Sequence, residues 1–451
     1  MSEKNKIIAA DLGSSHIALM AAEVVRGAVR VVGGMVKVGR NSAENLESAV
    51  QVLAVEENHK NGYVSNGVVV QPSGVAFQIG ELSKKLNNFL RLKKGKEITG
   101  IYVSVNAKSM KCVRHTVSNT FERFTEITTD HLSKMEEKCR TELTQGDTVV
   151  YDILAIDFKL DNKNFDEPPV KLKGYDLQIT YNVVVGDKII EENIIKSFNR
   201  FDISERTISP KKYKPLSVES LAESVLTPED TEDGVALLNI GATTTTLALY
   251  TNGILETLLV VPLGGYNITK DIEAEGMSES DAENLKINLG AAMKSIILKP
   301  VNIVVDSVLP DMVEVKIETP YLAEIIEARL KEIFKPIFDV LKIERNKIGA
   351  GIVLTGGGSN LKGIGEFIQK NTDMYVRFGD HSDKLTENTD KRFAEPVYAQ
   401  LVGMCLLIDE HKRNNPDPDE PPVIPSFKKR IEYYLGNLFP DPPDAKKPIY
   451  Q

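Results

Sequence analysis

The chain has 451 residues, more than one ordinary hydrophobic core uses, so we expect roughly three domains of about 150 residues each. Its composition, 42% hydrophobic and 26% charged, is that of a globular protein, and its net charge of −9 provides no basic field, which argues against nucleic acid as a partner. The 3 cysteines are odd in number and far apart, which favours a reducing compartment over a disulfide framework or a metal knuckle.

The first residues, MSEKNKIIAADLGSS, lack the apolar segment of a signal peptide. The longest apolar run, Ala399–Ile408, is far shorter than the ~20 residues that a spanning helix needs. We therefore expect a cytoplasmic protein, unless another element brings it to a membrane.

The N-terminal region begins as a β-meander. Short apolar strands are predicted at Lys6–Ala10, Ile17–Val25 and Val29–Val38. Helical spacing of apolar residues then predicts a helix at Ser73–Leu92, and Ile101–Val105 is a further strand.

A different pattern occupies the chain from about Ala107 to Ser209. It predicts strands at Val149–Leu160 and Gln178–Val185 and amphipathic helices near Thr129–Leu143 and Asp187–Phe201. We interpret this stretch as an inserted α+β domain.

The second half returns to alternating strands and helices and ends in a proline-rich linker, Asn414–Pro425 (NNPDPDEPPVIP). The expected elements are a helix at Leu216–Leu226, a hairpin at Val235–Val261, helices at Tyr266–Met277, Ser278–Leu298 and Tyr321–Leu341, a strand at Gly351–Thr355 and a final helix at Ala394–Asp409.

Two hairpin loops in different halves of the chain share one pattern. Ala10–Met20 (ADLGSSHIALM) and Leu238–Tyr250 (LNIGATTTTLALY) both run from an apolar strand through Asp or Asn, Gly and small polar residues into another strand, which suggests an internal duplication. Glycine lets backbone N–H groups approach an anion, and Ser and Thr hydroxyls add donors. Two such loops could grip a polyphosphate, although each alone is equally typical of an ordinary turn.

A third glycine-rich segment is Ile352–Ile364 (IVLTGGGSNLKGI), where a strand runs into three glycines and a helix start. A ring or a ribose could lie against that bare backbone, or the glycines could simply make a strand-to-helix turn.

The three segments together, in this order, resemble the phosphate-1, phosphate-2 and adenosine loops of the actin, Hsp70 and sugar-kinase superfamily. Within it, SLAESVLTPEDTEDGVALLNIGATTTTLALYTNG, VVPLGGYNITKDIEAEGMSESDAENLK and IVLTGGGSNLKGIGEFI resemble the FtsA family of bacterial actin-like cell-division proteins. The resemblance covers most of residues 6–410. It implies an α/β fold with two duplicated lobes, an inserted α+β subdomain of the SHS2 type, and a C-terminal amphipathic helix on a linker.

The resemblance also implies domain boundaries and a site for ATP with Mg²⁺. The first lobe core would be 1–96, 209–232 and 392–412, the inserted subdomain 97–208, the second lobe core 233–264 and 318–391, and its small subdomain 265–317, followed by a linker at 413–425, a helix at 426–439 and a tail at 440–451. Asp11 would organise Mg²⁺ through water. The ATP-binding residues would be Asp11, Gly13, Ser14, Ser15, His16, Asn239, Gly241, Ala242, Thr243, Thr244, Glu283, Lys286, Gly356, Gly357, Gly358 and Asn360.

Several residues depart from the family pattern or have two readings. Asn239 and Thr246 stand where these proteins usually carry Asp, and His16 stands where many carry Lys. Glu223 matches, in uncertain register, the residue that positions the attacking water, and it could equally be a solvated helix residue. Taken alone, Glu283 and Lys286 are better explained as a surface ion pair. Since Asn cannot act as a general base, we expect ATP to be bound but hydrolysed slowly or not at all.

The C-terminal segment predicts a basic amphipathic helix at Ser426–Phe439 that lies in a membrane surface. The competing interpretations are that this helix packs on the protein itself or binds a partner. The proline-rich linker before it favours the membrane, because a helix that packs on its own domain needs no such linker. The expected membrane-contact residues are Phe427, Lys428, Lys429, Arg430, Ile431, Tyr434, Leu435, Leu438 and Phe439.

The function implied by the resemblance is that of a filament-forming, ATP-binding adaptor that tethers the tubulin-like FtsZ ring to the cytoplasmic face of the inner membrane at the division septum. The FtsZ C-terminal peptide would dock on residues 265–317, and other division proteins on the inserted subdomain. One alternative is an actin-like pilus-assembly protein. The predicted membrane helix after the linker argues against this alternative. Another is a sugar kinase or phosphatase, which would need a carboxylate where Asn239 stands.

Overall fold

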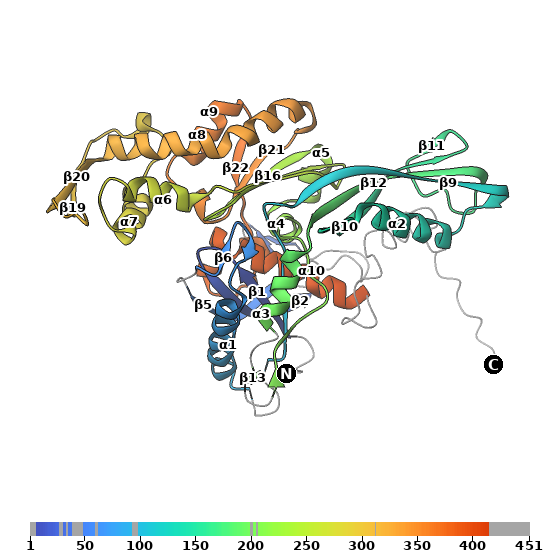
Figure 1. Ribbon diagram of the computed structural model, residues 1–451, viewed down its shortest axis with the longest axis horizontal. Helices are drawn as coiled ribbons and strands as arrows, with labels where there is room; N and C mark the ends of the chain where they lie inside the picture. The colour runs from blue at the N-terminus through green and yellow to red at the C-terminus, as the bar shows by residue number, and fades with distance from the viewer. Residues whose placement is uncertain are drawn as a thin grey trace. The chain divides into compact units, whose positions relative to one another are not determined.

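The protein is described here from a computed structural model, shown in Figure 1. Among the described residues, one compact unit (unit 1) is built from the chain up to Lys111 and from Asp187 onward, and a second (unit 2) from Cys112–Gly186. The described residues are 6–26, 30–32, 35–37, 48–58, 62–92, 98–198, 202–203, 206–311 and 313–414.

Unit 1 contains two sheets with the same strand order. The first has the order β15-β8-β1-β2-β5, and the second β22-β21-β16-β17-β18. In each sheet three consecutive strands pair antiparallel, and the first of them also pairs parallel with a later strand. This repeated topology is the two-lobed, duplicated architecture that the similar loops predicted. The strands are β1 (Lys6–Leu12), β2 (Ile17–Arg26), β5 (Ser48–Asn58), β8 (Gly100–Val103), β15 (Ser209–Pro210), β16 (Val235–Ile240), β17 (Thr245–Thr251), β18 (Ile254–Val261), β21 (Gly351–Thr355) and β22 (Val376–Phe378).

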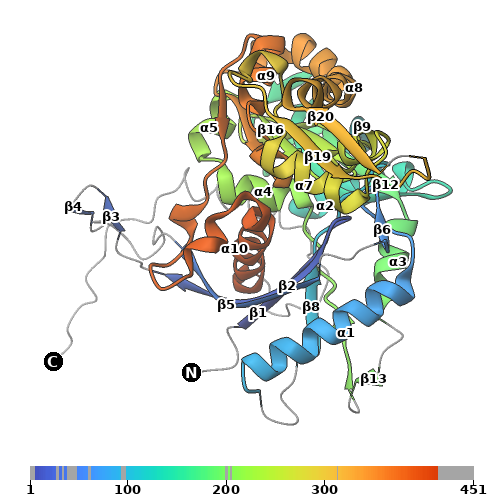
Figure 2. The ribbon, with the colours of Figure 1, turned by 90° about the vertical axis from the view of Figure 1, so that its left-hand side faces the viewer.

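The first sheet lies between two helices. Figure 2 shows α1 (Pro72–Phe89) on one face of β1, β2 and β5 and α10 (Ala399–Asn414) on the other. Helix α4 (Ser217–Val225) packs on α10. Smaller elements of this lobe are β3 (Arg30–Val32), β4 (Met35–Lys37), β6 (Val64–Ser65), β7 (Val68–Val69), α3 (Ile189–Phe198), β13 (Asp202–Ile203) and β14 (Arg206–Thr207).

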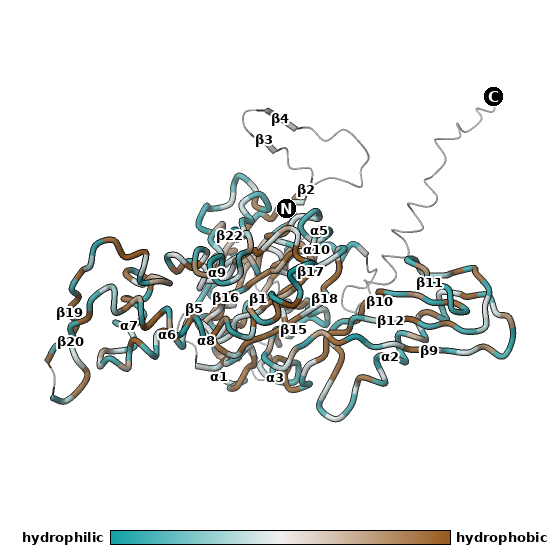
Figure 3. The backbone as a smooth tube through the Cα atoms, turned by 90° about the horizontal axis from the view of Figure 1, so that it is seen from above, coloured by the Kyte–Doolittle hydropathy of each residue, from teal (hydrophilic) through white to brown (hydrophobic). Residues whose placement is uncertain are grey.

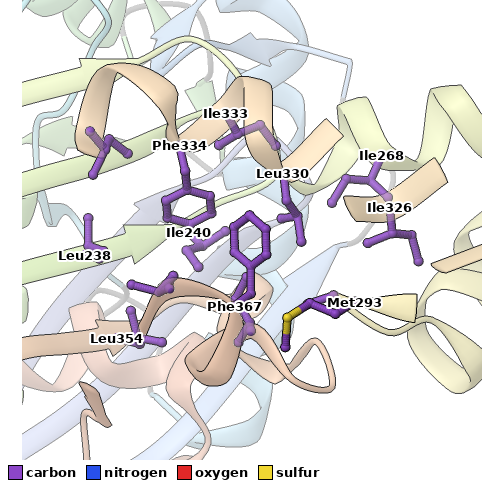
Figure 4. Close-up of a cluster of buried hydrophobic side chains, with 14 of the residues drawn as sticks. Leu238, Ile240, Ile268, Met293, Ile326, Leu330, Ile333, Phe334, Leu354 and Phe367 are labelled. Carbon is purple, nitrogen blue, oxygen red and sulfur yellow. The ribbon is translucent and has the colours of Figure 1, made fainter. Parts of the chain in front are cut away.

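The second sheet packs on α8 (Thr319–Glu344) and α9 (Ile364–Thr372). Figure 4 shows the apolar face of α8 directed at β16 and β21, with Phe334 close to Phe367 of α9. Their ring centroids are 6.0 Å apart in an edge-to-face arrangement, and both rings are buried. This core fixes the strands that lead into the predicted loops. The other elements of the lobe are α5 (Pro228–Asp233), α6 (Gly265–Glu273), α7 (Glu279–Leu289), β19 (Asn302–Asp306) and β20 (Glu314–Glu318).

Unit 2 is a sheet of order β11-β10-β12-β9 covered by one helix, α2 (Thr129–Leu143). Brown and teal alternate along β12 in Figure 3, because side chains of a strand point alternately to the two faces of the sheet. The chain leaves unit 1 after Lys111 and returns to it at Asp187. The two ends are close together, because the backbone N–H of Asp187 donates to Oγ of Ser109 over 3.2 Å. The strands are β9 (Lys111–Glu126), β10 (Thr148–Leu160), β11 (Lys163–Phe165) and β12 (Lys173–Asp187).

A carboxyl group is buried in the core of unit 2. Glu136 on α2 is 2% exposed, and its Oε1 has no hydrogen-bond partner among the described residues, although Nη2 of Arg140 lies 3.7 Å away. Burial, only partly offset by Arg140, raises the pKa of Glu136 to about 7. The Tyr181 hydroxyl is likewise buried without a partner in the described part of the chain. This core therefore favours the protonated form of Glu136.

The structure corrects several boundaries expected from the sequence. The inserted unit spans Cys112–Gly186 rather than 97–208, because β8 pairs with β1 and α3 packs against α1 in the first lobe. The helix expected at Ser278–Leu298 ends at Leu289, since the chain then pairs with Lys362 through the backbone of Ala292. Strands β5, β9 and β22 were not predicted.

No helix within the described ranges is both long enough and apolar enough to cross a membrane. The predicted linker at 413–425 lies almost entirely outside the described residues. The helix at 426–439, with its nine membrane-contact residues, and the tail at 440–451 lie wholly outside them.

Candidate functional site

The two predicted phosphate loops are equivalent four-residue turns. Loop 1 (residues 13–16) joins β1 to β2, and loop 2 (residues 241–244) joins β16 to β17. A Cβ on Gly13 would lie 2.9 Å from the carbonyl oxygen of His16, and one on Gly241 would lie 3.0 Å from that of Thr244. The first approach is too close for a side chain and the second is tight, so both turns favour glycine at their first position.

Loop 1 and loop 2 meet through their hydroxyl groups. Oγ1 of Thr243 donates to Oγ of Ser14 over 2.7 Å and accepts a hydrogen bond from the backbone N–H of Asn66 over 3.0 Å. Nδ2 of Asn106 donates to Oγ1 of Thr246 over 3.3 Å. The structure thus brings Ser14 and Thr243 together as predicted and adds Asn66 and Asn106, which the sequence analysis missed. The Asn-Gly turn at 66–67 was the available signal for the first of them.

Asp11 stands at the end of β1 and is largely buried. Its Oδ1 accepts a hydrogen bond from Nε2 of Gln400 over 3.0 Å, and its Oδ2 lies 3.7 Å from Nε2 of His16. Burial raises the pKa of Asp11, while the nearby His16 and the hydrogen bond from Gln400 oppose that rise. His16 also contacts Oγ of Ser15 through Nδ1, over 3.2 Å. Of the predicted loop 1 residues, His16 therefore lies beside the carboxylate, and Ser15 contacts His16.

In the second lobe, the residue that corresponds to Asp11 is the uncharged Asn239. Asn239 pairs across the sheet with Thr246 on β17 and with Thr355 on β21, so these three residues form one row on the same face. The two positions where relatives usually carry Asp are therefore direct neighbours, and here both are uncharged. A Cβ on Gly356 would collide with Oδ1 of Asn239, which places this amide against loop 3 (residues 356–358).

Loop 2 is supported from behind by the first turn of α6. The backbone N–H groups of Gly265 and Tyr266 donate to the carbonyl oxygens of Gly241 and Ala242, over 2.9 and 2.7 Å. Gly264 leaves room for this contact, since a Cβ there would collide with the same carbonyls. The free N–H groups of a helix start thereby hold the carbonyl side of loop 2, and the opposite side of the loop is left for a ligand.

Glu283 and Lys286 belong to this support. Nζ of Lys286 donates to the carbonyl oxygen of Gly265 over 3.0 Å, to Oγ1 of Thr269 over 2.8 Å and to Oε2 of Glu283 over 2.7 Å. Thr269 also donates to Glu283. The pair is thus more than a surface ion pair: it ties α7 to the start of α6 beside loop 2. Its reach to a ribose or an adenine stays a prediction.

Loop 3 follows β21 as a short 3₁₀ turn, Gly357–Asn360. A Cβ on Gly358 would collide with the side chain of Ile240, whereas Gly357 has open space beside it. Asn360 is exposed. Loops 2 and 3 therefore adjoin at the end of β16, as the order of the motifs predicted.

Glu223 lies on α4. It is exposed on that helix, about 9 Å beyond Ser217 at the helix start, using a rise of about 1.5 Å per residue. Ser217 itself is close to the site, because its Oγ lies 3.3 Å from Oγ of Ser104. The proposed water-positioning role of Glu223 stays a prediction.

The residues present fit a magnesium-bound polyphosphate. Two glycine turns face each other with hydroxyls between them, and one buried carboxylate stands beside loop 1. Among the described residues no group of three or more His, Cys, Asp or Glu side chains could hold a metal ion. A cation here would therefore rely on phosphate and water oxygens together with Asp11, which is typical of Mg²⁺.

Comparisons with known proteins agree with this architecture. A family model described as cell division protein FtsA matches residues 236–403. Cell division protein FtsA of Escherichia coli (strain K12) is 24% identical over 463 residues, covering 97% of this chain and 99% of that protein. The protein of the same name from Borreliella burgdorferi is 24% identical over 420 residues, covering 91% and 93%. Among solved structures, a chain of a PilM-PilN type IV pilus biogenesis complex superposes with a TM-score of 0.57 at 14% identity, covering 89% of this chain and 98% of that one, which shows a shared fold.

Proposed function

Because the chain is similar to the cell division protein FtsA over nearly its whole length and has the two-lobed actin-like fold, we propose that it is an ATP-binding division protein that tethers FtsZ filaments to the inner membrane. The observation that carries the proposal is the hydroxyl contact between loops 1 and 2, from Thr243 to Ser14, beside the buried Asp11. A polyphosphate is the ligand whose chemistry matches donors converging from two lobes.

Each part of the site has a separate task in this proposal. Loops 1 and 2 donate N–H groups and hydroxyls to the phosphates, and loop 3 lies beside the nucleoside. Asp11 would order the water around Mg²⁺, and the ion would neutralise phosphate charge. Because Asn239 and Thr246 are neutral, neither offers a carboxylate to take a proton from an attacking water. ATP then acts as a clamp that holds the lobes closed and hydrolysis is slow.

Nucleotide binding is tested by titration calorimetry of the full chain with ATP in Mg²⁺. The expected result is binding that Ser14→Ala and Thr243→Val each weaken about tenfold, about 1.4 kcal/mol for a lost hydrogen bond to a charged group. Thr251→Val, at the far end of β17, is the matched control and should bind as the parent does. The absence of ATP binding, or rapid steady-state phosphate release, would contradict the proposal.

The membrane contact is proposed from the sequence of residues 426–439. Single amphipathic helices bind reversibly, so filament formation would strengthen attachment by avidity. The full chain should sediment with anionic liposomes, more so with ATP, and a chain ending at Asn414 should not. Leu435→Asp should abolish sedimentation while Asn437→Asp, the same charge on the polar face, should retain most of it. Unchanged sedimentation after truncation would remove the anchor.

The FtsZ peptide is proposed to dock on residues 265–317, and exposed apolar side chains in this range support the proposal. Leu298 is 90% exposed, Val313 85% and Ile287 67%, and such side chains are available to a binding partner. Leu298→Asp should weaken binding of the FtsZ C-terminal peptide in fluorescence anisotropy, whereas Leu172→Asp on unit 2 should not. Equal binding by both variants would place the peptide elsewhere.

A further inference from the structure

A polar side chain interrupts the apolar start of α10 and reaches the predicted metal site. Gln400 is the second residue of a helix whose next turn, Leu401, Val402, Met404 and Cys405, is buried. It lies 389 residues from Asp11 in sequence, yet its Nε2 donates to Oδ1 of that residue over 3.0 Å. A primary amide placed among apolar neighbours needs such partners, since burying it unpaired is costly.

Both hydrogens of the Gln400 amide nitrogen are used. Besides Asp11, Nε2 lies 3.0 Å from Oγ of Ser104, which directly follows β8. An amide nitrogen has two N–H donors, and a carboxylate only accepts, so the chemistry fixes which end of the amide faces Asp11. The amide is therefore held in a single orientation.

Four segments converge on this contact. Asp11 ends β1, Ser104 follows the parallel strand β8, and Gln400 begins α10. Ser217 at the start of α4 joins through Ser104, and its backbone N–H donates to Val105 over 2.9 Å. Ligands of parallel sheets bind outside the carboxyl ends of their strands, so this network stands at the edge where a ligand belongs.

We propose that Gln400 is a positioning residue for the nucleotide site: it holds Oδ1 of Asp11 and so fixes the orientation of the carboxylate that would order the water around a nucleotide-bound Mg²⁺. The proposal rests on the proposed function. Gln400 acts through Asp11 and does not touch the nucleotide, so it affects the part of ATP affinity that depends on Mg²⁺.

The test measures ATP affinity of the full chain by calorimetry, once with Mg²⁺ and once with EDTA. In the parent, Mg²⁺ should tighten binding. Gln400→Met keeps the length and volume of the side chain but lacks donors, and should lose about tenfold of affinity in Mg²⁺ with less than about twofold change in EDTA. Gln369→Met, an exposed glutamine on α9, is the matched control and should leave both affinities unchanged.

A double-mutant cycle separates positioning from packing. In an Asp11→Asn background, Gln400→Met should have no further effect on the Mg²⁺-dependent affinity, because its partner is already gone. Ser104→Ala removes the second hydrogen-bond partner of Gln400 without changing α10, and it should lose part of the Mg²⁺-dependent affinity for ATP. This variant tests the inference even if Gln400→Met is too unstable to assay. Equal losses in Mg²⁺ and EDTA, or additive losses in the cycle, would overturn the inference while leaving nucleotide binding intact. A parent that binds no ATP would overturn both.

Discussion

The buried Glu136 predicts how the stability of unit 2 depends on pH. In the folded chain burial raises the pKa of this carboxyl from 4.5 to about 7, so the folded state keeps a proton that the unfolded chain has already released. The contribution of Glu136 to the free energy of unfolding is therefore largest at low pH, and it falls as the pH rises between these two pKa values. The perturbation is Glu136→Gln, which keeps the shape and removes the titration.

The size of the effect follows from the two pKa values. A difference of about 2.5 units is worth roughly 3 kcal/mol in full, at about 1.36 kcal/mol per unit. Between about pH 5.5 and about pH 8.5 the linkage relation gives a loss of about 2 kcal/mol, or a roughly 30-fold increase in opening. The Glu136→Gln variant has no proton to release at this position and should show no such loss.

Hydrogen exchange measured by mass spectrometry gives this quantity for each segment of the full chain. After correction for the pH dependence of chemical exchange, peptides from α2 and β12 of the parent should lose about 30-fold of protection over that range. Peptides from α8 in unit 1 are the internal reference. Glu126→Gln, at an exposed carboxyl of β9, should keep the parent's slope. Equal slopes in the parent and in Glu136→Gln would refute the reasoning.

Three further outcomes are expected. Gly264→Ala should lower both the melting temperature and the affinity for ATP, because its Cβ would collide with the carbonyls of loop 2, whereas Gly357→Ala, with open space beside it, should leave the melting temperature unchanged. Asn239→Asp should raise steady-state phosphate release from ATP at least about tenfold in a malachite-green assay, since a positioned carboxylate base contributes more than that in other enzymes; no gain would mean that this row of the sheet does not face the reacting phosphate. Phe334→Ala should cost about 3–5 kcal/mol in urea unfolding, against less than about 0.5 kcal/mol for Ile343→Ala on the exposed side of α8.

Local patterns explain the parts of the fold that could be predicted from the sequence. The strand Gly351–Thr355 has the predicted bounds because four apolar or β-branched residues follow a glycine and another glycine ends it. The helix Thr129–Leu143 also has the predicted bounds, since Thr128 caps it and accepts a hydrogen bond from the backbone of His131. Strand β9 was missed because polar residues also occupy positions on its core-facing side. His115 and Asn119 alternate there with Val113, Val117 and Phe121, so the apolar pattern along the strand is weak.

Some residues of the candidate site could be predicted from local patterns, and others could not. The glycines and hydroxyls of both loops lie within a few residues of each other and formed a readable pattern. Ser104 and Asn106 both follow β8, whereas Gln400 lies 296 residues after Ser104. They reach the loops through the pairing of parallel strands and the packing of α10, which no local pattern encodes. The one signal for Gln400 was that it breaks an apolar run, and a polar residue in such a run is worth treating as a candidate for a buried contact.

The hydrogen bond between Ser109 and Asp187 has a consequence for how this architecture can change over evolutionary time. The chain departs from unit 1 and returns to it at residues that lie close together, so unit 2 is an inserted cassette whose two ends meet. The entropic cost of closing such an insertion grows slowly with its length. A lineage could lengthen or replace the cassette without changing where the chain leaves and re-enters unit 1. Unit 2 and the loop-bearing strands of unit 1 can then diverge at different rates, and exchanging unit 2 between relatives would test whether it determines partner choice.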